Sequence, residues 1–235
     1  MLCMKKVFGT YFKKRKTIKW AIAIALFAAL NILVKLFAFE ICEVKGYSMY
    51  PTYRHGDYLL VSKCAYNVRL PRNIYEIPWI GILANYLTPD SIVDKTLKGV
   101  ESFKYVGNFL PVQHNDILVF NVPIYLKECA VKRCIGLPGE NISQYIGECE
   151  SPYITPFEVV PYKGFEIKSS LLSDAERKAL IDMPSFKYSE ADSVFIAGED
   201  CFFVLGDNRA VSEDSRVWGV IPKSLIVGKV ICKLF

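Results

Sequence analysis

The first segment with residue types that could perform chemistry is Gly46-Tyr-Ser-Met-Tyr-Pro-Thr52, in which the Ser48 hydroxyl precedes a Pro-Thr turn. A serine hydroxyl is a weak nucleophile unless a neighbouring base removes its proton. Serine is also common in turns, where it hydrogen-bonds to nearby backbone. Ser48 alone is therefore better interpreted as a turn residue, and a catalytic role requires a base from elsewhere in the chain.

A candidate base, Lys132, lies in the second segment, Val131-Lys-Arg-Cys-Ile-Gly-Leu-Pro-Gly139. The run around it is apolar and β-like, and a period of two puts Lys132 on the same face as Ala130 and Cys134. Burial among such groups disfavours the ammonium form and lowers the pKa of a lysine by up to several units. A neutral lysine can accept a proton from serine. The alternative is a lysine on an edge strand that points into solvent.

The third segment runs from Gly206 to Pro222, directly after a hydrophobic run that ends at Leu205, and is rich in Asp, Asn, Ser and Arg. Side chains of these types hydrogen-bond to nearby backbone and hold loops in one conformation. The segment therefore predicts an ordered loop that can hold a catalytic lysine in place. A solvated turn is the alternative, but Trp218 and the flanking Gly and Pro residues favour the ordered loop.

Two histidines, His55 and His114, offer a different base for the serine. Because His55-Gly56-Asp57 follows Ser48 closely, a Ser-His-Asp hydrolase is an alternative. Both histidines, however, lie near an aspartate and near the start of a predicted strand. A turn role is the preferred interpretation for both.

The amino-terminal segment holds the basic bias of the chain. Residues 1–39 contain eight Lys and Arg and no acid, so the remainder has 29 − 8 = 21 basic residues against 24 acidic ones. The remainder is thus slightly acidic, and no basic face for nucleic acid is expected.

An apolar run from Trp20 to Phe39 follows the basic residues. About 20 such residues in a helix cross the ~30 Å hydrocarbon core of a bilayer. By the positive-inside rule the sequence predicts a cytoplasmic tail at 1–17, a single membrane anchor at 18–39, and all later residues outside. A cleaved secretory signal is the alternative, since small alanines recur in the run, but they lie near its start, where a cleavage site should not be.

Residues 40–235 predict a mainly β domain, an antiparallel sheet with irregular insertions. Five β-type runs are bounded by Gly, Pro, Asp or Asn: Tyr58–Ser62, Ile117–Val122, Cys129–Ile135, Cys201–Leu205 and Leu225–Ile231. Residues 66–113 contain several prolines and no clean period, which predicts an irregular insertion. A second insertion at 142–198 contains a predicted helix that begins with a capping box of Ser173 and Glu176 and stops at Pro184.

Cysteines are numerous, and seven of the eight follow the apolar run. Cys129 and Cys134 lie on one predicted strand, where five residues separate Cα atoms by ~16 Å and turn the side chains to opposite faces, against a limit of ~7 Å for a disulfide. These two are therefore not expected to pair unless the strand is broken. No CxxC pair or Cys/His cluster has zinc spacing, so neither a metal nor another cofactor is expected.

In this order, behind an amino-terminal anchor, the three segments resemble the bacterial type I signal peptidases. The family pattern includes a Ser-Met-x-Pro-Thr box, a Lys-Arg-x-x-Gly-x-Pro-Gly box and a Gly-Asp-Asn-x-x-x-Ser-x-Asp-Ser-Arg box. The matching residues, together with two strand motifs, are Ser48–Thr52, Lys132–Gly139, Gly206–Arg216, Gly56-Asp57 and Asn115–Phe120.

The resemblance implies a serine endopeptidase with Ser48 as nucleophile and neutral Lys132 as general base. Ser212 would hydrogen-bond to the lysine amine and orient it, and the Ser48 backbone N–H would help to bind the oxyanion. Other loop residues would support the site without reacting: Gly206, Asp207, Asn208, Asp214, Ser215 and Arg216. Candidates for binding the small substrate residues before the cut are Val44, Met49 and Val131.

The resemblance also implies the substrates and the location. These are exported precursor proteins with signal peptides, cut at the outer face of the cell (inner) membrane near the secretion translocon. Met49 and residues 37–39 are also candidates for contact with the lipid bilayer. One departure concerns the oxyanion site, since some members place a serine two residues before the nucleophile and this chain has Gly46. Two alternatives stay open: a dedicated peptidase for a pilin-like substrate, and a non-catalytic, membrane-tethered β scaffold.

Overall fold

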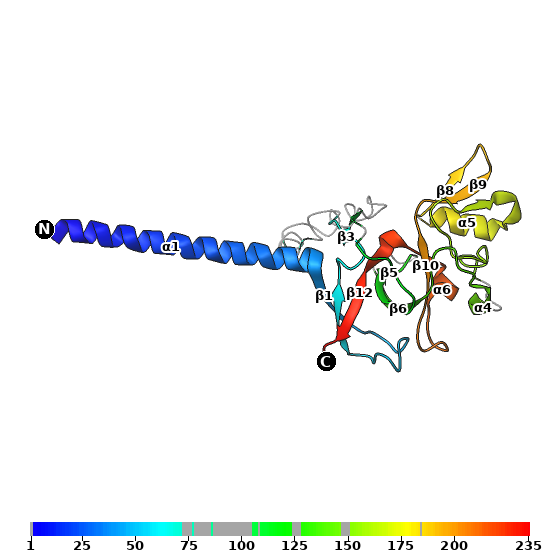
Figure 1. The fold of residues 1–235 in the computed structure, drawn as a ribbon, viewed down its shortest axis with the longest axis horizontal. Helices are drawn as coiled ribbons and strands as arrows, with labels where there is room; N and C mark the ends of the chain where they lie inside the picture. Colours follow the sequence, from blue (N-terminus) through cyan, green and yellow to red (C-terminus); the bar gives the residue numbers. More distant parts are fainter. Residues whose placement is uncertain are drawn as a thin grey trace.

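The computed structural model describes residues 2–71, 77, 86, 105–107, 109–123, 128–146, 151–183 and 185–235. A long N-terminal helix projects from a β-rich domain, and the C-terminus lies on the side of the domain that the helix joins (Figure 1). Helix α1 (Leu2–Leu33) continues as a π-helical turn, η1 (Val34–Ala38), and strand β1 (Phe39–Glu43) begins at the next residue. The predicted fold class, mainly antiparallel β with an apolar N-terminal helix, is confirmed.

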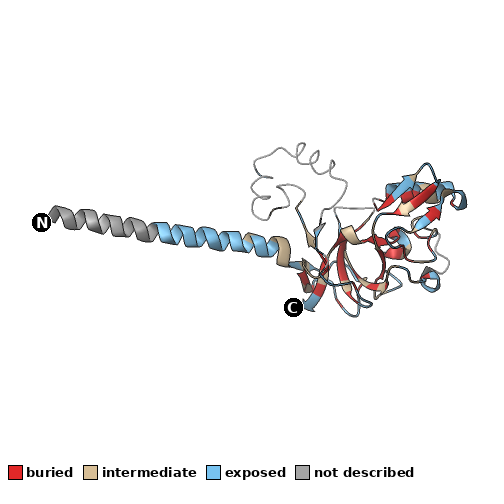
Figure 2. Ribbon diagram, turned by 45° about the horizontal axis from the view of Figure 1, so that its top comes forward, coloured by how far each residue is buried: buried red, intermediate tan, exposed pale blue. Residues whose placement is uncertain are grey.

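The apolar part of this helix, Ile18–Ala38, is 21 residues long, has a mean hydropathy of 2.3 and is not buried. Within the described ranges it is the one helix long and apolar enough to cross a membrane. Figure 2 shows most of this segment in pale blue, for exposed residues, and much of the strands of the domain in red, for buried residues. Asn31, a polar residue in the run, donates from Nδ2 to the Phe27 carbonyl oxygen at 2.9 Å. This bond lowers the cost of placing the amide in an apolar medium.

A seven-stranded antiparallel sheet forms the framework of the domain, in the order β1-β2-β12-β5-β6-β10-β11. Besides β1 its strands are β2 (Tyr58–Ser62), β5 (Ile117–Asn121), β6 (Cys129–Gly136), β10 (Cys201–Leu205), β11 (Ile221–Pro222) and β12 (Ile226–Lys233). All five predicted strands are present, with ends that differ by one or two residues at most. β1 and β11 are absent from the prediction, because β1 continues an apolar run without a break and β11 is very short.

Two of the apolar clusters that pack on this sheet meet along β5. One contains Val119 with buried residues from the β1–β2 region, including Val44, Met49 and Leu59. The other contains Leu118 and Phe120 with residues such as Cys134, Phe202 and Trp218. Successive side chains of a strand point to opposite faces, so β5 contributes to both clusters. The strand is therefore apolar at nearly every position instead of alternating.

A smaller unit lies at the end of the domain remote from α1 (Figure 1). It contains a three-stranded sheet in the order β7 (Glu166–Lys168), β9 (Val194–Ala197), β8 (Phe186–Ser189), and the helix α5 (Asp174–Asp182). The other short elements are β3 (Val68–Arg69) paired with β4 (Tyr105–Val106), α4 (Ser143–Ile146), α6 (Ser215–Trp218), η3 (Ser169–Leu171) and η4 (Lys223–Leu225). Much of the predicted irregular insertion at 66–113 lies outside the described residues.

The predicted helix in the second insertion is confirmed as α5. The Ser173 side chain accepts from the Glu176 amide, and Glu176 accepts in return from the Ser173 amide, which completes the capping box. Ala179 and Leu180 bury the inner face of the helix. It ends at Asp182; the predicted stop residue, Pro184, lies outside the described residues.

The cysteine prediction also agrees with the structure. β6 is unbroken from Cys129 to Cys134, and both thiols are free. Cys42, Cys64, Cys201 and Cys232 are free as well.

Replacement of Ser173 by Ala is expected to destabilise the protein by about 1 kcal/mol, because the first turn of α5 loses a side-chain acceptor. The measurement is the midpoint of thermal unfolding of the full-length protein in detergent. Lys178→Ala, at an exposed position of the same helix, is the matched control, since Lys and Ala have similar helix propensities. Equal midpoints for Ser173→Ala and wild type would contradict the capping role.

Candidate active site

Ser48 lies in a tight turn that follows β1. The Tyr50 amide donates to the Tyr47 carbonyl oxygen at 3.2 Å, and the Tyr53 amide donates to the Met49 carbonyl oxygen at 2.9 Å. Met49 is 1 % exposed and belongs to the same core cluster as Tyr53. The turn is therefore anchored in the core, and the predicted contact of Met49 with lipid is wrong, because this side chain has almost no surface.

The Ser48 hydroxyl meets the side chain of Lys132, which comes from β6. Lys132 Nζ lies 2.5 Å from Ser48 Oγ, although the two residues are 84 apart in the sequence. Lys132 is only 4 % exposed. Ala130 and Cys134, which the sequence places on the same face of β6, pack in the cluster that contains Trp218. Nζ lies 5.7 Å from the centroid of that tryptophan ring.

Burial lowers the pKa of Lys132 from 10.5 to about 8. The nearby carboxylates of Asp214 and Glu213 act in the opposite direction, because negative charge favours the ammonium form. A substantial fraction of Lys132 is therefore neutral at mildly alkaline pH. In that form the amine can accept a proton from the hydroxyl that it contacts.

The loop after β10 is organised by the fully buried carboxylate of Asp214. Its Oδ2 accepts from the Gly206 amide at 3.0 Å, and its Oδ1 accepts from Arg216 Nε at 2.9 Å. Asp214 also caps α6 by accepting from the Arg216 amide. Ser215, buried next to it, accepts from the Val204 amide of β10 at 3.0 Å. The structure thus brings four predicted support residues together in one hydrogen-bonded loop.

An ion pair and a hydrogen bond on one carboxylate connect the segments that contain Ser48, Lys132 and Gly206. Arg133 Nε and Nη2 donate to the two carboxylate oxygens of Asp207 at 2.8 and 2.7 Å. Thr52 Oγ1 donates to the same carboxylate at 2.5 Å. Burial alone would raise the pKa of Asp207, but the bonds from Arg133 and Thr52 outweigh this effect and hold the pKa below its ordinary value. We call this group the Arg133–Asp207–Thr52 clamp.

Backbone contacts bring the loop after β10 against the turn that contains Ser48. The Asn208 amide donates to the Ser48 carbonyl oxygen at 2.9 Å. A Cβ added to Gly206 would lie 2.6 Å from that same oxygen and would overlap the Ser212 side chain. Gly206, Ser212 and Ser48 are therefore immediate neighbours, and only a residue without a side chain fits at position 206.

Ser212 lies at the site, but its hydroxyl points to another partner. Among the described residues its Oγ donates to the Glu213 carbonyl oxygen at 3.3 Å. The expected hydrogen bond between Ser212 and the Lys132 amine is not formed in this conformation.

The three predicted substrate-binding residues share one apolar cluster. Val44 and Met49 are buried in it, and the partly exposed Val131 packs against it. Met49 has no free surface for a substrate, which leaves Val131 and the edge of Val44 as candidates. Their contact with substrate remains a prediction.

Three contributors to the site escape the sequence prediction. Arg133 and Thr52 form the clamp with Asp207, and Trp218 lies beside the Lys132 amine. Arg133 directly follows the predicted base, and Asp207 lies in the predicted loop. Their opposite charges are the one sequence feature that could have predicted this ion pair. No sequence signal points to the Trp218 contact with Lys132.

Neither histidine contacts Ser48 in the described part of the structure. His114 Nε2 lies 2.8 Å from Glu140 Oε1. His55 Nδ1 accepts a hydrogen bond from the Gly46 amide at 3.1 Å. Both histidines are therefore occupied in turns, in agreement with the preferred interpretation.

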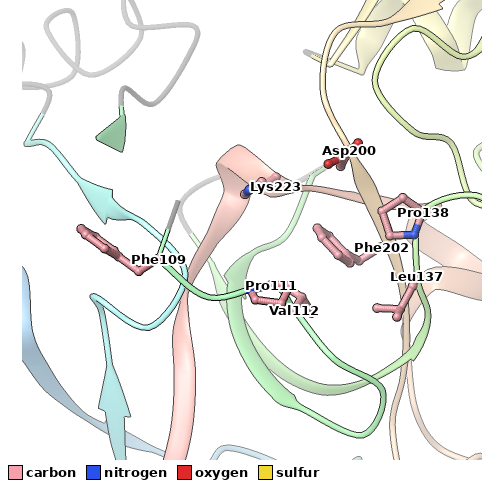
Figure 3. A pocket seen from close by; sticks show the side chains of 8 residues that line it. All are labelled: Phe109, Pro111, Val112, Leu137, Pro138, Asp200, Phe202 and Lys223. Carbon is pink, nitrogen blue, oxygen red and sulfur yellow. The ribbon is translucent and has the colours of Figure 1, made fainter. Parts of the chain in front are cut away.

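A cavity of about 240 Å³ lies away from these residues, between the segment before β5, the end of β6 and β10 (Figure 3). Its lining consists of Phe109, Pro111, Val112, Leu137, Pro138, Asp200, Phe202 and Lys223. None of them is a predicted site residue. In the described ranges no group of three or more His, Cys, Asp or Glu side chains is placed to hold a metal ion.

Comparison with known proteins agrees with the boxes in the sequence. The family described as "Signal peptidase, peptidase S26" matches residues 17–235. The chain therefore belongs to this family of serine peptidases, and the resemblance inferred from the sequence is confirmed.

Relatives named signal peptidase I are similar to the chain over most of its length. One from Bacillus caldolyticus is 28 % identical over 225 residues, which cover 93 % of this chain and 89 % of the relative. One from Buchnera aphidicola subsp. Baizongia pistaciae is 23 % identical over 271 residues, covering 94 % and 77 %. A crystal structure of a signal peptidase I from Enterococcus faecalis V583 is 26 % identical and covers 52 % of this chain and 98 % of that chain, with a TM-score of 0.28.

Substitution of Gly206 by Ala tests the packing of the loop after β10 against the turn that contains Ser48. Because the new Cβ would lie 2.6 Å from the Ser48 carbonyl oxygen, the turn must move. We expect the rate of peptide cleavage to fall at least ~10-fold, since small displacements of reacting groups are costly. Gly198→Ala is the control, because its closest contact is 3.3 Å, to the Ser185 carbonyl oxygen. An unchanged rate for Gly206→Ala would show that the turn does not depend on this contact.

Proposed function

We propose that this chain is a membrane-bound serine endopeptidase that removes N-terminal signal peptides from exported precursor proteins. The observation that carries the proposal is the 2.5 Å contact between the buried Lys132 amine and the Ser48 hydroxyl. The family match and the relatives named signal peptidase I support the substrate class.

In the proposed first step, neutral Lys132 accepts the hydroxyl proton while Ser48 Oγ attacks the carbonyl carbon of the scissile bond. Negative charge then develops on the carbonyl oxygen and requires hydrogen-bond donors. The Ser48 N–H suits this role, since it has no acceptor among the described residues. A donor of this type contributes on the order of 3 kcal/mol to the transition state.

In the next step the Lys132 ammonium gives its proton to the leaving amine, and the peptide C–N bond breaks. The lysine is then neutral again and takes a proton from the water molecule that attacks the acyl-enzyme. Collapse of this second intermediate returns a proton to Ser48 Oγ and frees the carboxyl end of the signal peptide. Ser212, after rotation away from Glu213, would orient the amine during these transfers.

The proposed location follows from the anchor and its distance to the nucleophile. The excess of basic residues before the span favours a cytoplasmic N-terminus. Ser48 follows the end of the span at Ala38 by 48 − 38 = 10 residues, a chain that reaches at most ~35 Å. Exported precursors present their cleavage sites at this surface, so a shared membrane plane raises the effective concentration of the cut site. The proposed partners are these precursors, the bilayer and the neighbouring secretion translocon.

The decisive experiment compares wild type with Ser48→Ala and Lys132→Met on several unrelated purified precursors in detergent. Both variants are expected to lose at least ~10³-fold in kcat, because nucleophile and base act as a unit. Ser143→Ala and Lys187→Met, at exposed positions away from the dyad, are the matched controls and should cleave at the wild-type rate.

Three outcomes of this comparison would contradict the proposal in different ways. Cleavage by Ser48→Ala or Lys132→Met at the wild-type rate would exclude the dyad. Cleavage of a single precursor out of the panel would favour a dedicated peptidase. Absence of cleavage by the wild type on every precursor would favour the tethered scaffold.

A second prediction concerns pH. Only the neutral form of Lys132 can accept the serine proton, and its pKa is lowered to about 8. The logarithm of kcat/KM should therefore rise with pH, with a slope of about one below pH 8, and level off above it. The measurement is a rate profile from mildly acidic to alkaline pH. A flat profile across this range would contradict a titrating lysine base.

A further inference from the structure

We propose that His55 is a positioning residue of the peptidase site, whose Nδ1 accepts a hydrogen bond from the Gly46 amide and thereby fixes the backbone just before the nucleophile. This inference rests on the proposed role of Ser48. The bond measures 3.1 Å. The imidazole also contacts Tyr47, with ring centroids 6.0 Å apart. To accept this bond, Nδ1 must be unprotonated, so the ring is neutral with its hydrogen on Nε2.

Gly46 is the point at which the chain turns toward Ser48. Its φ is +83°, in the left-handed region, and an added Cβ would have no atom within 4 Å. Glycine is needed here for its backbone angle and not for lack of space. Because glycine visits many other backbone angles at little cost, an external contact is required to hold this one. The bond to His55 Nδ1 provides it.

The turn that presents His55 is itself held firmly. The Asp57 carboxylate accepts from the Arg54 amide at 2.9 Å and pairs with Lys233 Nζ at 2.7 Å. The backbone of Val44 exchanges two hydrogen bonds with this turn: its amide donates to the Asp57 carbonyl oxygen at 2.8 Å, and its carbonyl oxygen accepts from the Gly56 amide at 2.9 Å. These bonds hold the backbone around His55 in place. The bond from the Gly46 amide to His55 therefore ties the backbone before Ser48 to a fixed turn.

The effect of this bond should appear in the transition state. The direction of the Ser48 N–H depends on the backbone angles of residues 46 and 47, and position 46 has no side chain that could supply a hydroxyl donor. An error in this direction weakens the contact to the oxyanion but not the binding of the uncleaved precursor. Loss of the bond should therefore lower kcat and leave KM nearly unchanged.

Three substitutions of His55 distinguish the effect of the Nδ1 acceptor from the effect of the rest of the imidazole ring. In His55→Asn the amide oxygen is attached to Cγ, as Nδ1 is in histidine, and can accept from Gly46. In His55→Gln the acceptor lies one bond farther away, and His55→Leu has none. The measurement is kcat and KM of the full-length protein on one purified precursor, with the thermal unfolding midpoint of each variant. His114→Leu, which removes the contact with Glu140, is the control for loss of a surface histidine.

We expect His55→Gln and His55→Leu to lower kcat about 5- to 20-fold with KM within about twofold, and His55→Asn to stay within about twofold of wild type. Wild-type kcat in all three variants would overturn the proposal. An equal loss in all three would also overturn it, because the ring contact with Tyr47 and not the Nδ1 acceptor would then be responsible. Failure of the proposed function is recognised separately, because it appears in the comparison of wild type with Ser48→Ala, which does not involve His55.

Discussion

The chemistry proposed for this protein depends on one lysine being kept away from water. Lys132 is 4 % exposed, with Ser48 Oγ at 2.5 Å and the Trp218 ring nearby. A buried ammonium is costly, and the cost disappears when the amine loses its proton. The Asp214 and Glu213 carboxylates act in the opposite direction and favour the charged form, but burial has the larger effect. The balance leaves both protonation states accessible, as a group that accepts and returns a proton requires.

Such a lysine can act as a base only if the serine is held against it. Successive side chains of β6 point to opposite faces, and this strand therefore supplies both the lysine and a contact that holds the serine turn in place. Lys132 points to one face of the strand and reaches Ser48, while its neighbour Arg133 points to the other and reaches Asp207. Thr52, four residues after Ser48, binds the same carboxylate. The Arg133–Asp207–Thr52 clamp thus links the strand, the turn that contains Ser48 and the loop after β10. Bidentate arginine–carboxylate contacts have the directionality that this task requires.

Much of this arrangement is predictable from the sequence, because the main strands are apolar runs between turn residues. The match to the family boxes also predicts that the segments around Ser48, Lys132 and Gly206 come together in one site. The position of Met49 is not predictable in this way. An apolar residue beside Ser48 is compatible with burial in the core and with contact to lipid, and only the packing of the folded domain distinguishes the two. The small sheet escapes prediction because a three-residue strand such as β7, exposed at both ends, has no readable period. The partner of the Ser212 hydroxyl, the Glu213 carbonyl oxygen at 3.3 Å, is likewise not encoded in any sequence pattern.

The junction between α1 and the sheet contains no linker. η1 ends at Ala38 and β1 begins at Phe39, where it pairs at once with β2. Lys63 ties the two sides together, since its amide donates to the Ala38 carbonyl oxygen at 2.9 Å and its Nζ donates to the Lys35 carbonyl oxygen at 3.2 Å. A helix that changes its tilt to match a thinner or thicker bilayer would therefore turn the whole domain with it. In the proposed membrane-bound arrangement, bilayer thickness would in this way set the height of Ser48 above the lipid. The composition of the membrane would then affect which cleavage sites the serine can reach.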